Sequence, residues 1–322
     1  MTDLASYLEI DLPRINVFLE RETTKLDPVV QPVVRHVLLA GGKRLRPLLT
    51  LLTARSMGTR GVDILPMACA LEFLHSATLL HDDILDGARL RRGQEAAHIV
   101  FGRTETILAG DVLLALANRL TAEYGLSSLT FALADAIMRT ATGEVREIAG
   151  IRKADMDIEE YLRVITDKTA YLFQCGCRCG AILSGRGKDM ESAAKDFGFN
   201  LGVAFQLVDD ALDYSAGSDV SGKPLGGDLR EGKLTMPLIF YFQDLDPDGR
   251  QVMAKKFERD ELTERDIHMV LAQVREKGFA EKTRAAAVKY AERARLALAV
   301  FPDGEEKAVL GQILDYVLAR EK

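Results

Sequence analysis

The sequence contains no uninterrupted apolar run of 18 or more residues, so we expect no membrane-spanning helix. Its first residues, MTDLASYLEIDLPR, lack the positive segment and apolar run of a secretory signal, and none is expected. An excess of basic residues is also missing, because 42 Lys and Arg against 48 Asp and Glu give a formal charge of −6. Nucleic acid is therefore not an expected partner. Any anion must be bound by local clusters of basic residues.

Cysteine is scarce, and three of the four residues alternate in the segment QCGCRCGA. Zinc sites pair cysteines across two to four intervening residues, whereas Cys175, Cys177 and Cys179 have one residue between neighbours. The small residues of this segment favour a tight contact between helices instead of a metal site. Unpaired thiols are typical of a reducing compartment, so we expect a cytoplasmic protein.

Alternating strand patterns are missing as well, and no NG or DG turn joins two β-branched runs. Helical periodicity dominates in segments such as MACALEFLHSATLLHDDIL, LTFALADAIMRTATGEVREIAG and AEKTRAAAVKYAERARLALAVF. Glycine and proline gather between these segments, as in LAGGKRLRP and SGRGKD. With 48% apolar residues, enough for a large core, the sequence predicts one all-α domain over residues 1–322.

What the chain does have is the pentad Asp-Asp-x-x-Asp, twice. The copies are Asp82, Asp83 and Asp86 in LLHDDILDGARLRRG, and Asp209, Asp210 and Asp213 in AFQLVDDALDYSAG. On an α-helix the first and last aspartates of the pentad share a face. Carboxylates in apolar surroundings need a partner or a metal, and Mg²⁺ suits one or two carboxylates plus phosphate oxygens. One pentad is commonly a solvated helix face, but two predict a site for several divalent cations and a diphosphate.

Basic residues form several local groups along the chain, and two of these groups follow the acidic motifs. They are Lys43, Arg44 and Arg46 in GGKRLRP, which should open a helix, Arg91 and Arg92 after the first motif, Lys168 in TDKTAYLF, and Lys223, Arg230 and Lys233 in SAGSDVSGKPLGGDLREGK. Arginine binds phosphate in a bidentate way, and lysine acts as a mobile point charge. The glycine-rich segment is a candidate lid or an ordinary connector. His75 is either a core residue or a diphosphate donor, while His81 and His98 are expected to be structural.

These motifs, in this order, resemble the trans-prenyltransferases, the polyprenyl diphosphate synthases. The resemblance covers nearly the whole chain, from GGKRLRP at 41–47 to EGKLTMP at 231–237. It implies an all-α fold of the isoprenoid synthase type, with antiparallel helices around a central cavity. It also implies a homodimer. The apolar segment TILAGDVLLALANRL is either part of the dimer interface or part of the core.

The resemblance also implies roles for individual residues. Lys43, Arg46, His75 and Arg92 would bind the diphosphate of isopentenyl diphosphate, while Arg91, Lys168 and Lys233 would bind that of the allylic substrate, joined by Lys223 as the loop closes. Three magnesium ions per active site would be held mainly by Asp82, Asp86 and Asp209, with Asp83, Asp210 and Asp213 in support through water. Thr169 and Gln206 would lie near the reacting carbons and, with Lys168, form the catalytic group.

The implied reaction is ionisation, then condensation, then elimination. Magnesium and the basic residues stabilise the departing diphosphate. The double bond of isopentenyl diphosphate attacks the allylic cation, and a proton is lost to the released diphosphate. The chain departs from the family pattern at one place. After Gly143 and Glu144 the family commonly has a glutamine, and this chain has Arg146 and Glu147, so the role of this turn stays open.

The length of the product is expected to depend on the helix before the first motif. The residues five and four before Asp82 are Ala77 and Thr78, and in the family an aromatic residue there blocks the tunnel for the growing chain. Ala77 is small, and Phe73 and Leu74 lie one turn deeper. One helical turn is about 5.4 Å, roughly one isoprene unit, so we predict an octaprenyl-type product of about C30 to C50. A shorter farnesyl or geranylgeranyl product is the alternative.

Three other functions fit parts of the pattern. A terpene cyclase shares the all-α fold and one acidic motif, but it usually replaces the second motif with an Asn-Ser/Thr-Glu triad and needs no isopentenyl site. A non-catalytic regulatory subunit would be favoured by lost aspartates, and both motifs are complete here. A helical scaffold with acidic surface faces predicts neither turnover nor dependence on magnesium.

Overall fold

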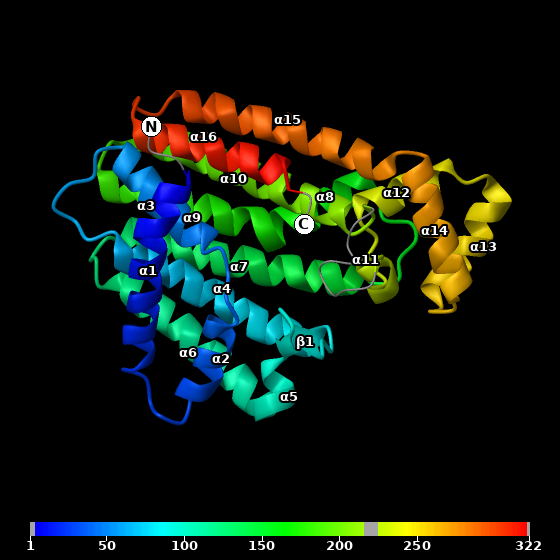
Figure 1. Cartoon of the computed structure of the whole chain (residues 1–322), viewed down its shortest axis with the longest axis horizontal. Helices are drawn as coiled ribbons and strands as arrows, with labels where there is room; N and C mark the ends of the chain where they lie inside the picture. Colours follow the sequence, from blue (N-terminus) through cyan, green and yellow to red (C-terminus); the bar gives the residue numbers. More distant parts are fainter. Residues whose placement is uncertain (1–3, 216–224, 321–322) are drawn as a thin grey trace. The chain divides into compact units, whose positions relative to one another are not determined.

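The protein is almost entirely helical, as its computed structural model shows for residues 4–215 and 225–320, the part of the chain that the structure describes (Figure 1). Within these residues the only strands are Leu90–Arg91 (β1) and Gln94–Glu95 (β2), which pair antiparallel as a short hairpin. The predicted all-α class is confirmed. None of the helices in these residues is long and apolar enough to cross a bilayer.

The chain divides into two compact units. The first comprises the described residues of Met1–Ile137, Leu172–Lys195 and Ala297–Gln312, and the second those of Met138–Tyr171, Asp196–Leu296 and Ile313–Lys322. The boundaries fall inside helices α7 (Ser127–Gly150), α10 (Lys188–Leu212), α15 (Phe279–Ala299) and α16 (Glu305–Leu318), and after the first residue of α9 (Tyr171–Ser184). The expected single domain over residues 1–322 stays a prediction.

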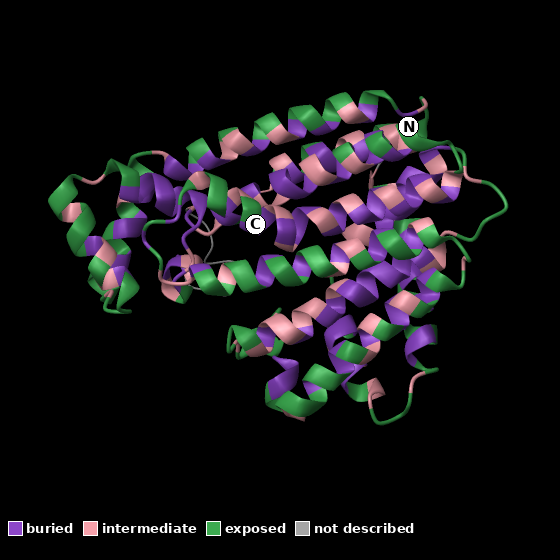
Figure 2. Cartoon of the chain, turned by 180° about the vertical axis from the view of Figure 1, so that it is seen from behind, coloured by how far each residue is buried: buried purple, intermediate pink, exposed green. Residues whose placement is uncertain are grey.

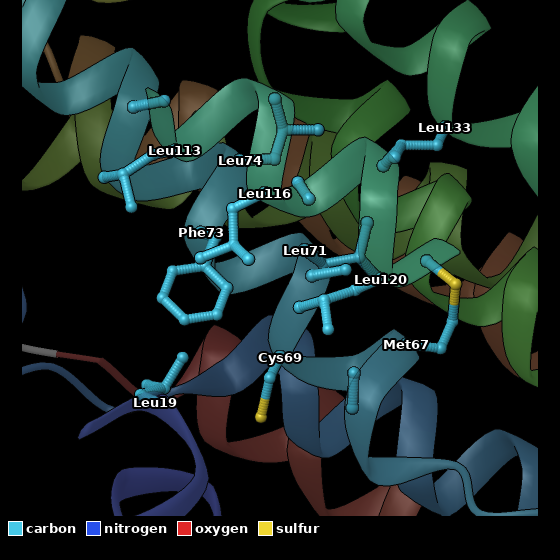
Figure 3. Packing of buried hydrophobic residues seen from close by; sticks show 14 of the residues in the cluster. Leu19, Met67, Cys69, Leu71, Phe73, Leu74, Leu113, Leu116, Leu120 and Leu133 are labelled. Carbon is cyan, nitrogen blue, oxygen red and sulfur yellow. The ribbon is translucent and has the colours of Figure 1, made fainter. Parts of the chain in front are cut away.

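The first unit is built around one central helix. Its whole elements are α1 (Leu4–Thr23), α2 (Gln31–Leu39), α3 (Leu45–Ser56), α4 (Leu65–Leu85), α5 (Ala97–Phe101) and α6 (Arg103–Ala122), with nearly all of α9 (Tyr171–Ser184). Helix α4 packs against α6, α3 and α1. Every residue from Met67 to Leu74 is buried, so this part of α4 is enclosed on all sides. Figure 3 shows Phe73, Leu113 and Leu116 gathered in the resulting core.

The cysteine-rich helix α9 packs closely on α3. A Cβ atom placed on Gly180 would lie 2.7 Å from the carbonyl oxygen of Thr50, and one on Gly176 would lie 3.2 Å from the Thr50 hydroxyl. Only glycine permits this approach, because any side chain would displace the backbone of α3. All four cysteines of the chain are buried free thiols. The tight helix contact predicted for this segment is confirmed.

The second unit contains the remaining short elements. They are α8 (Ile158–Ile165), the π-helical turn η1 (Thr166–Ala170), α11 (Gly227–Glu231), α12 (Met236–Asp244), α13 (Pro247–Glu258) and α14 (Glu264–Glu276). Helix α12 packs against α8, α13 and α14. Helix α15 is exposed along one side, while Ala280, Thr283, Ala287 and Ala291 form a buried stripe at helical spacing (Figure 2).

Candidate active site

The first aspartate motif lies at the C-terminal end of α4. Asp82 and Asp83 belong to the last turn, and Asp86 is the C-cap, whose N–H donates to the Asp82 carbonyl at 2.8 Å. Carboxylates at a helix C-terminus face the negative end of its dipole, so they need positive partners. Asp83 is buried and accepts hydrogen bonds from Arg91, including one from Nε at 2.8 Å. Asp82 is half-buried and Asp86 is exposed.

The two arginines after this motif occupy the β1–β2 hairpin. Arg91 ends β1, and Arg92 has a positive φ of 52°, which the turn requires. The side chain of Arg92 reaches back to the loop before α3. A Cβ atom on Gly42 would lie 2.7 Å from Nη1 of Arg92, so glycine at this position makes room for the guanidinium. The hairpin and the GGKRLRP segment are thereby brought together within the first unit.

The GGKRLRP segment opens α3, as predicted, with Arg44 as the residue before the helix. Arg46 lies over the ring of Phe173, 4.8 Å from its centroid, and its Nε is buried without a hydrogen-bond partner. Burial, reinforced by the charge of Arg92, lowers the pKa of Arg46 to about 10. A guanidinium with a buried, unsatisfied donor beside a second cation is a site that an anion would complete. Lys43 lies exposed in the same segment.

His75, on α4, belongs to the same basic cluster. Its pKa is held well below its ordinary value, first by burial and then by the charges of Arg46 and Arg92. The imidazole is therefore neutral near pH 7 and has one N–H to donate. The hydroxyl of Thr78 donates to the His75 carbonyl at 2.8 Å. We call Arg46, His75 and Arg92 the basic cluster of the first unit.

The predicted chain-length residues follow the same helix. Phe73 and Leu74 are buried in the core of the first unit (Figure 3). Ala77 is buried in the same core, and Thr78 is half-buried. Phe73 and Ala77 are one turn apart on α4. A larger or smaller side chain at either position would therefore change the volume within this core.

The second aspartate motif lies at the C-terminal end of α10, in the second unit. Asp209 accepts a hydrogen bond from Nη2 of Arg320 at 2.9 Å. Asp213, just beyond the helix, accepts from the backbone N–H groups of Gly227 at 3.1 Å and Asp228 at 3.0 Å, at the start of α11. The donors that hold these two carboxylates come from two different segments of the second unit.

Asp210 is the buried member of the second motif. It accepts hydrogen bonds from the hydroxyl of Tyr161 and from Nε2 of Gln206, the latter at 2.8 Å. Burial nevertheless raises the pKa of Asp210 to about 7, and it raises that of the nearby Asp228 well above its ordinary value. The surplus of buried negative charge is the condition that a bound divalent cation relieves, so the oxygen donors of this motif fit a hard metal ion.

No ready-made metal cage accompanies these donors. Across residues 4–215 and 225–320, no three Asp, Glu, His or Cys side chains are grouped so that they could hold a metal ion. Mg²⁺ usually keeps several waters and takes one or two carboxylates together with substrate phosphates. The aspartates therefore fit magnesium as part of a coordination shell that water or a phosphate ligand would complete.

Two of the three predicted catalytic residues are in contact with each other. The hydroxyl of Thr169 donates to Oε1 of Gln206 at 2.9 Å, and Gln206 in turn donates to Asp210. Thr169 and Lys168 lie on the π-helical turn η1, a feature found often at functional sites. Gly143 makes room for this turn, because a Cβ atom there would lie 2.8 Å from the Cα of Lys168.

Lys168, the third predicted catalytic residue, binds carboxylates of α7. Its Nζ lies 2.6 Å from Oε2 of Glu144 and also contacts Glu147. Arg146, beside Glu147, forms an ion pair with Asp167. The two residues at which the chain departs from the family pattern thus both contact the π-helical turn.

Lys233 lies near the same carboxylate, and its Nζ is 3.9 Å from Oε2 of Glu147. Lys223 lies outside the residues that the structure describes. Tyr161 and Arg320 are neighbours of the second motif that no sequence pattern indicated. Arg320 lies over the ring of Phe205, and its Nε and Nη1 are buried without hydrogen-bond partners. Arg320 lies 111 residues from Asp209 along the chain, so their contact becomes visible only in the folded structure.

Known proteins resemble this chain in sequence. The family model for polyprenyl synthetase matches residues 27–274. Octaprenyl diphosphate synthase of Escherichia coli strain K12 is 32% identical over 312 residues, which are 97% of this chain and 96% of that protein. Geranylgeranyl diphosphate synthase of Methanosarcina mazei is 33% identical over 311 residues, which cover 92% of this chain and 93% of that protein.

Solved structures resemble it over the same length. A decaprenyl diphosphate synthase from Rhodobacter capsulatus has a TM-score of 0.93 and 37% sequence identity, covering 99% of this chain and 98% of its own. A polyprenyl synthase from Caulobacter crescentus CB15, complexed with calcium and isoprenyl diphosphate, has a TM-score of 0.92 and 36% identity, covering 99% and 97%. With this family model and these relatives matched over most of its length, the chain belongs to the polyprenyl synthetase family and is a prenyltransferase.

Proposed function

We propose that this prenyltransferase condenses isopentenyl diphosphate with an allylic diphosphate to give a trans-polyprenyl diphosphate, with magnesium as its metal. The observation that carries the proposal lies on α4. His75, the member of the basic cluster on α4, shares this helix with the carboxylates of Asp82 and Asp86, and Arg46 of the same cluster brings an unsatisfied donor from the start of α3. Groups for an anion and for a hard cation around one helix suit a substrate with a metal-bound diphosphate.

The proposed division of work assigns each group of residues to one substrate. Lys43, Arg46, His75 and Arg92 bind the diphosphate of isopentenyl diphosphate, and Arg91, Lys168, Lys223 and Lys233 bind that of the allylic substrate. Thr169 and Gln206 present hydroxyl and amide dipoles to the allylic cation, and the proton is lost to the released diphosphate. The fixed basic side chains stabilise charge as it develops on the leaving group.

The metal ligands are assigned by the resemblance to the polyprenyl diphosphate synthases. Asp82, Asp86 and Asp209 hold magnesium directly, and Asp83, Asp210 and Asp213 support it through water, with three ions per active site. Bound magnesium supplies positive charge that neutralises the leaving diphosphate. Asp83 is paired with Arg91 and Asp210 with Tyr161, which favours contact with the metal through water for these two carboxylates. The calcium-bound structure from Caulobacter crescentus supports a divalent cation.

For the product we propose an octaprenyl-type chain of about C30 to C50, based on roughly one isoprene unit per helical turn. The small side chain of Ala77 on α4 supports it, and so do the names of the octaprenyl and decaprenyl relatives. The geranylgeranyl diphosphate synthase of Methanosarcina mazei, at 33% identity, keeps a shorter product as the alternative.

The function is tested by incubating the purified chain with labelled isopentenyl diphosphate, farnesyl diphosphate and magnesium. We expect label in an extractable prenyl product, and none once the metal is chelated. Asp82→Asn and Asp209→Asn should each lower kcat by about 10²- to 10³-fold, because each removes electrostatic stabilisation of the leaving group. Asp189→Asn, at an exposed position of α10, is the matched control and should leave kcat unchanged. Absence of product from the native chain with magnesium would contradict the proposal.

We further propose a homodimer located in the cytoplasm. Exposed apolar side chains along α7, namely Phe131, Met138 and Val145, support an interface there. In the TILAGDVLLALANRL segment, Leu113 and Leu116 are buried in the core, whereas Ile107 and Leu108 are exposed. Sedimentation equilibrium should give twice the mass of one chain. The mass of a single chain at micromolar concentration would contradict the dimer.

A further inference from the structure

Glu147 is shared by two lysines of the proposed allylic site. Nζ of Lys168 donates to Oε2 of Glu147, and Nζ of Lys233 lies 3.9 Å from the same oxygen. The three side chains are 14% to 21% exposed, so solvent screens their charges less than at an open surface. Two ammonium groups are thus held near a single carboxylate oxygen.

Each of these lysines has another carboxylate partner. Nζ of Lys168 lies 2.6 Å from Oε2 of Glu144, and Nζ of Lys233 lies 2.9 Å from Oε2 of Glu231. At least three carboxylates therefore lie near the two ammonium groups. An ammonium group has three N–H donors, so the oxygens of an arriving diphosphate must compete with these carboxylates for them. Removing the charge of Glu147 would take one nearby negative charge away from both lysines.

We propose that Glu147 is a positioning residue that holds Lys168 and Lys233 together and, through its negative charge, weakens their binding of the allylic diphosphate. The inference rests on the proposed function, which assigns both lysines to that substrate. Glu147 acts in two ways. Its oxygen orients the ammonium groups, and its charge repels a diphosphate that approaches them. The site thus binds its allylic substrate less tightly than the two lysines alone would allow.

The substitution Glu147→Gln separates these two effects. Glutamine has nearly the same shape and keeps an oxygen acceptor for the lysines, but it carries no charge. Lys168 keeps its contact with Glu144, and Lys233 keeps that with Glu231. Glu147→Asp is the conservative variant, because it retains the charge. Glu159→Gln is the matched control, because it removes one negative charge from an exposed pair with Arg163 in the same unit.

Steady-state kinetics with magnesium test the inference. Glu147→Gln should lower KM for the allylic diphosphate by about tenfold, the effect of 1.4 kcal/mol in binding. KM for isopentenyl diphosphate should not change, and kcat should not rise in proportion. Glu147→Asp and Glu159→Gln should keep the native KM for the allylic substrate. Calorimetric titration of each variant with inorganic diphosphate and magnesium gives the binding effect without turnover, and Glu147→Gln should bind more tightly than the native chain.

The other outcomes separate this inference from the function on which it rests. An active native enzyme with an unchanged or raised allylic KM in Glu147→Gln overturns the inference and leaves the function standing. A higher magnesium requirement in this variant also overturns it, because Glu147 would then be a metal ligand. A native chain without turnover defeats the proposed function. In that case calorimetry decides the inference, and equal affinities of the native chain and Glu147→Gln for inorganic diphosphate overturn it.

Discussion

Arg44 and Glu72 form a buried ion pair that joins the start of α3 to the middle of α4. Nη1 of Arg44 donates to Oε1 of Glu72 at 2.6 Å, and both side chains are less than a tenth exposed. Nη2 of the same guanidinium donates to the carbonyl oxygen of Leu38. Arg44 also has a left-handed backbone with φ of 47°. The pair thereby fixes the segment that carries Lys43 and Arg46.

This relationship predicts a large effect on stability. Glu72→Ala leaves the guanidinium buried without its counter-charge, and removing one partner of a buried ion pair typically costs about 3–5 kcal/mol. Urea denaturation should show this loss in the free energy of unfolding. Glu123→Ala is the control, because Glu123 pairs with Arg119 at 3.8 Å and both side chains are exposed. Its cost should stay below about 1 kcal/mol. Equal effects of the two variants would contradict the assigned role of the pair.

Gly143→Ala should destabilise the protein and impair turnover. The added Cβ would overlap the backbone of Lys168 and Asp167, which cannot move away as a flexible side chain would. Such overpacking costs about 1–3 kcal/mol, and it displaces the turn that carries Lys168 and Thr169. The melting temperature, measured by thermal unfolding, and kcat should both fall.

The matched control for this variant is Gly311→Ala on α16. There the nearest atom to an added Cβ belongs to Leu298 at 3.9 Å, an ordinary contact distance. Alanine should stabilise this helix by about 0.5–1 kcal/mol. A stabilised and fully active Gly143→Ala variant would show that the π-helical turn does not depend on glycine at 143.

His75 predicts a specific dependence of stability on pH. Its pKa in the folded chain is well below the ordinary 6.5, because of burial and then the charges of Arg46 and Arg92. As the pH falls below about 6.5, His75 binds a proton in the unfolded chain but not in the folded chain. The free energy of unfolding therefore falls by up to about 1.4 kcal/mol per pH unit. The loss ends once the pH passes the folded pKa.

His75→Asn should remove this part of the slope. The free energy of unfolding, measured by urea titration at pH 7.5 and pH 5.5, should differ less in the variant than in the native chain. His268→Asn, at an exposed position of α14, controls for the removal of an imidazole. Equal slopes in His75→Asn and the native chain would show that the imidazole is not held neutral in the fold.

Local patterns explain which features the sequence could predict. Helical periodicity and glycine or proline between segments are read within a few residues, and they indicated the all-α class and the opening of α3 within GGKRLRP. Helical patterning also placed both aspartate motifs in helical stretches. In contrast, Tyr161 reaches Asp210 across 49 residues, and Arg320 reaches Asp209 across 111. Such contacts depend on packing between distant segments, which no local pattern encodes.

Asp83 of the first motif also has contacts that no local sequence pattern could predict. Spacing predicted a shared face for Asp82 and Asp86, but the burial of Asp83 and its pairing with Arg91 follow from the β1–β2 hairpin, which turns Arg91 back onto α4. The hairpin strands have two residues each, which is too short for an alternating pattern to be visible. The π-helical turn η1 (Thr166–Ala170) is also without a sequence signal. It packs against Gly143 of α7, a contact between distant segments.

Opposite substitutions on α4 should move the product length in opposite directions. Ala77 is fully buried in the core of the first unit, so Ala77→Phe places an aromatic ring where the growing chain is proposed to run and should shorten the product. Phe73→Ala, one turn away, removes a ring from the same core and should lengthen it. Each turn spans about 5.4 Å, so we expect changes of roughly one or more isoprene units. Chromatography of the dephosphorylated products measures the shift.

The pair of variants also controls for damage to the fold. Phe→Ala in a core typically costs about 3–5 kcal/mol and overpacking about 1–3 kcal/mol, so both variants are expected to be less stable. Loss of stability alone would lower the yield of product in both without changing its length in opposite directions. Circular dichroism confirms that each variant is folded under assay conditions. Products of native length from both folded variants would remove this part of α4 from the wall of the chain-binding tunnel and leave the product length to other helices.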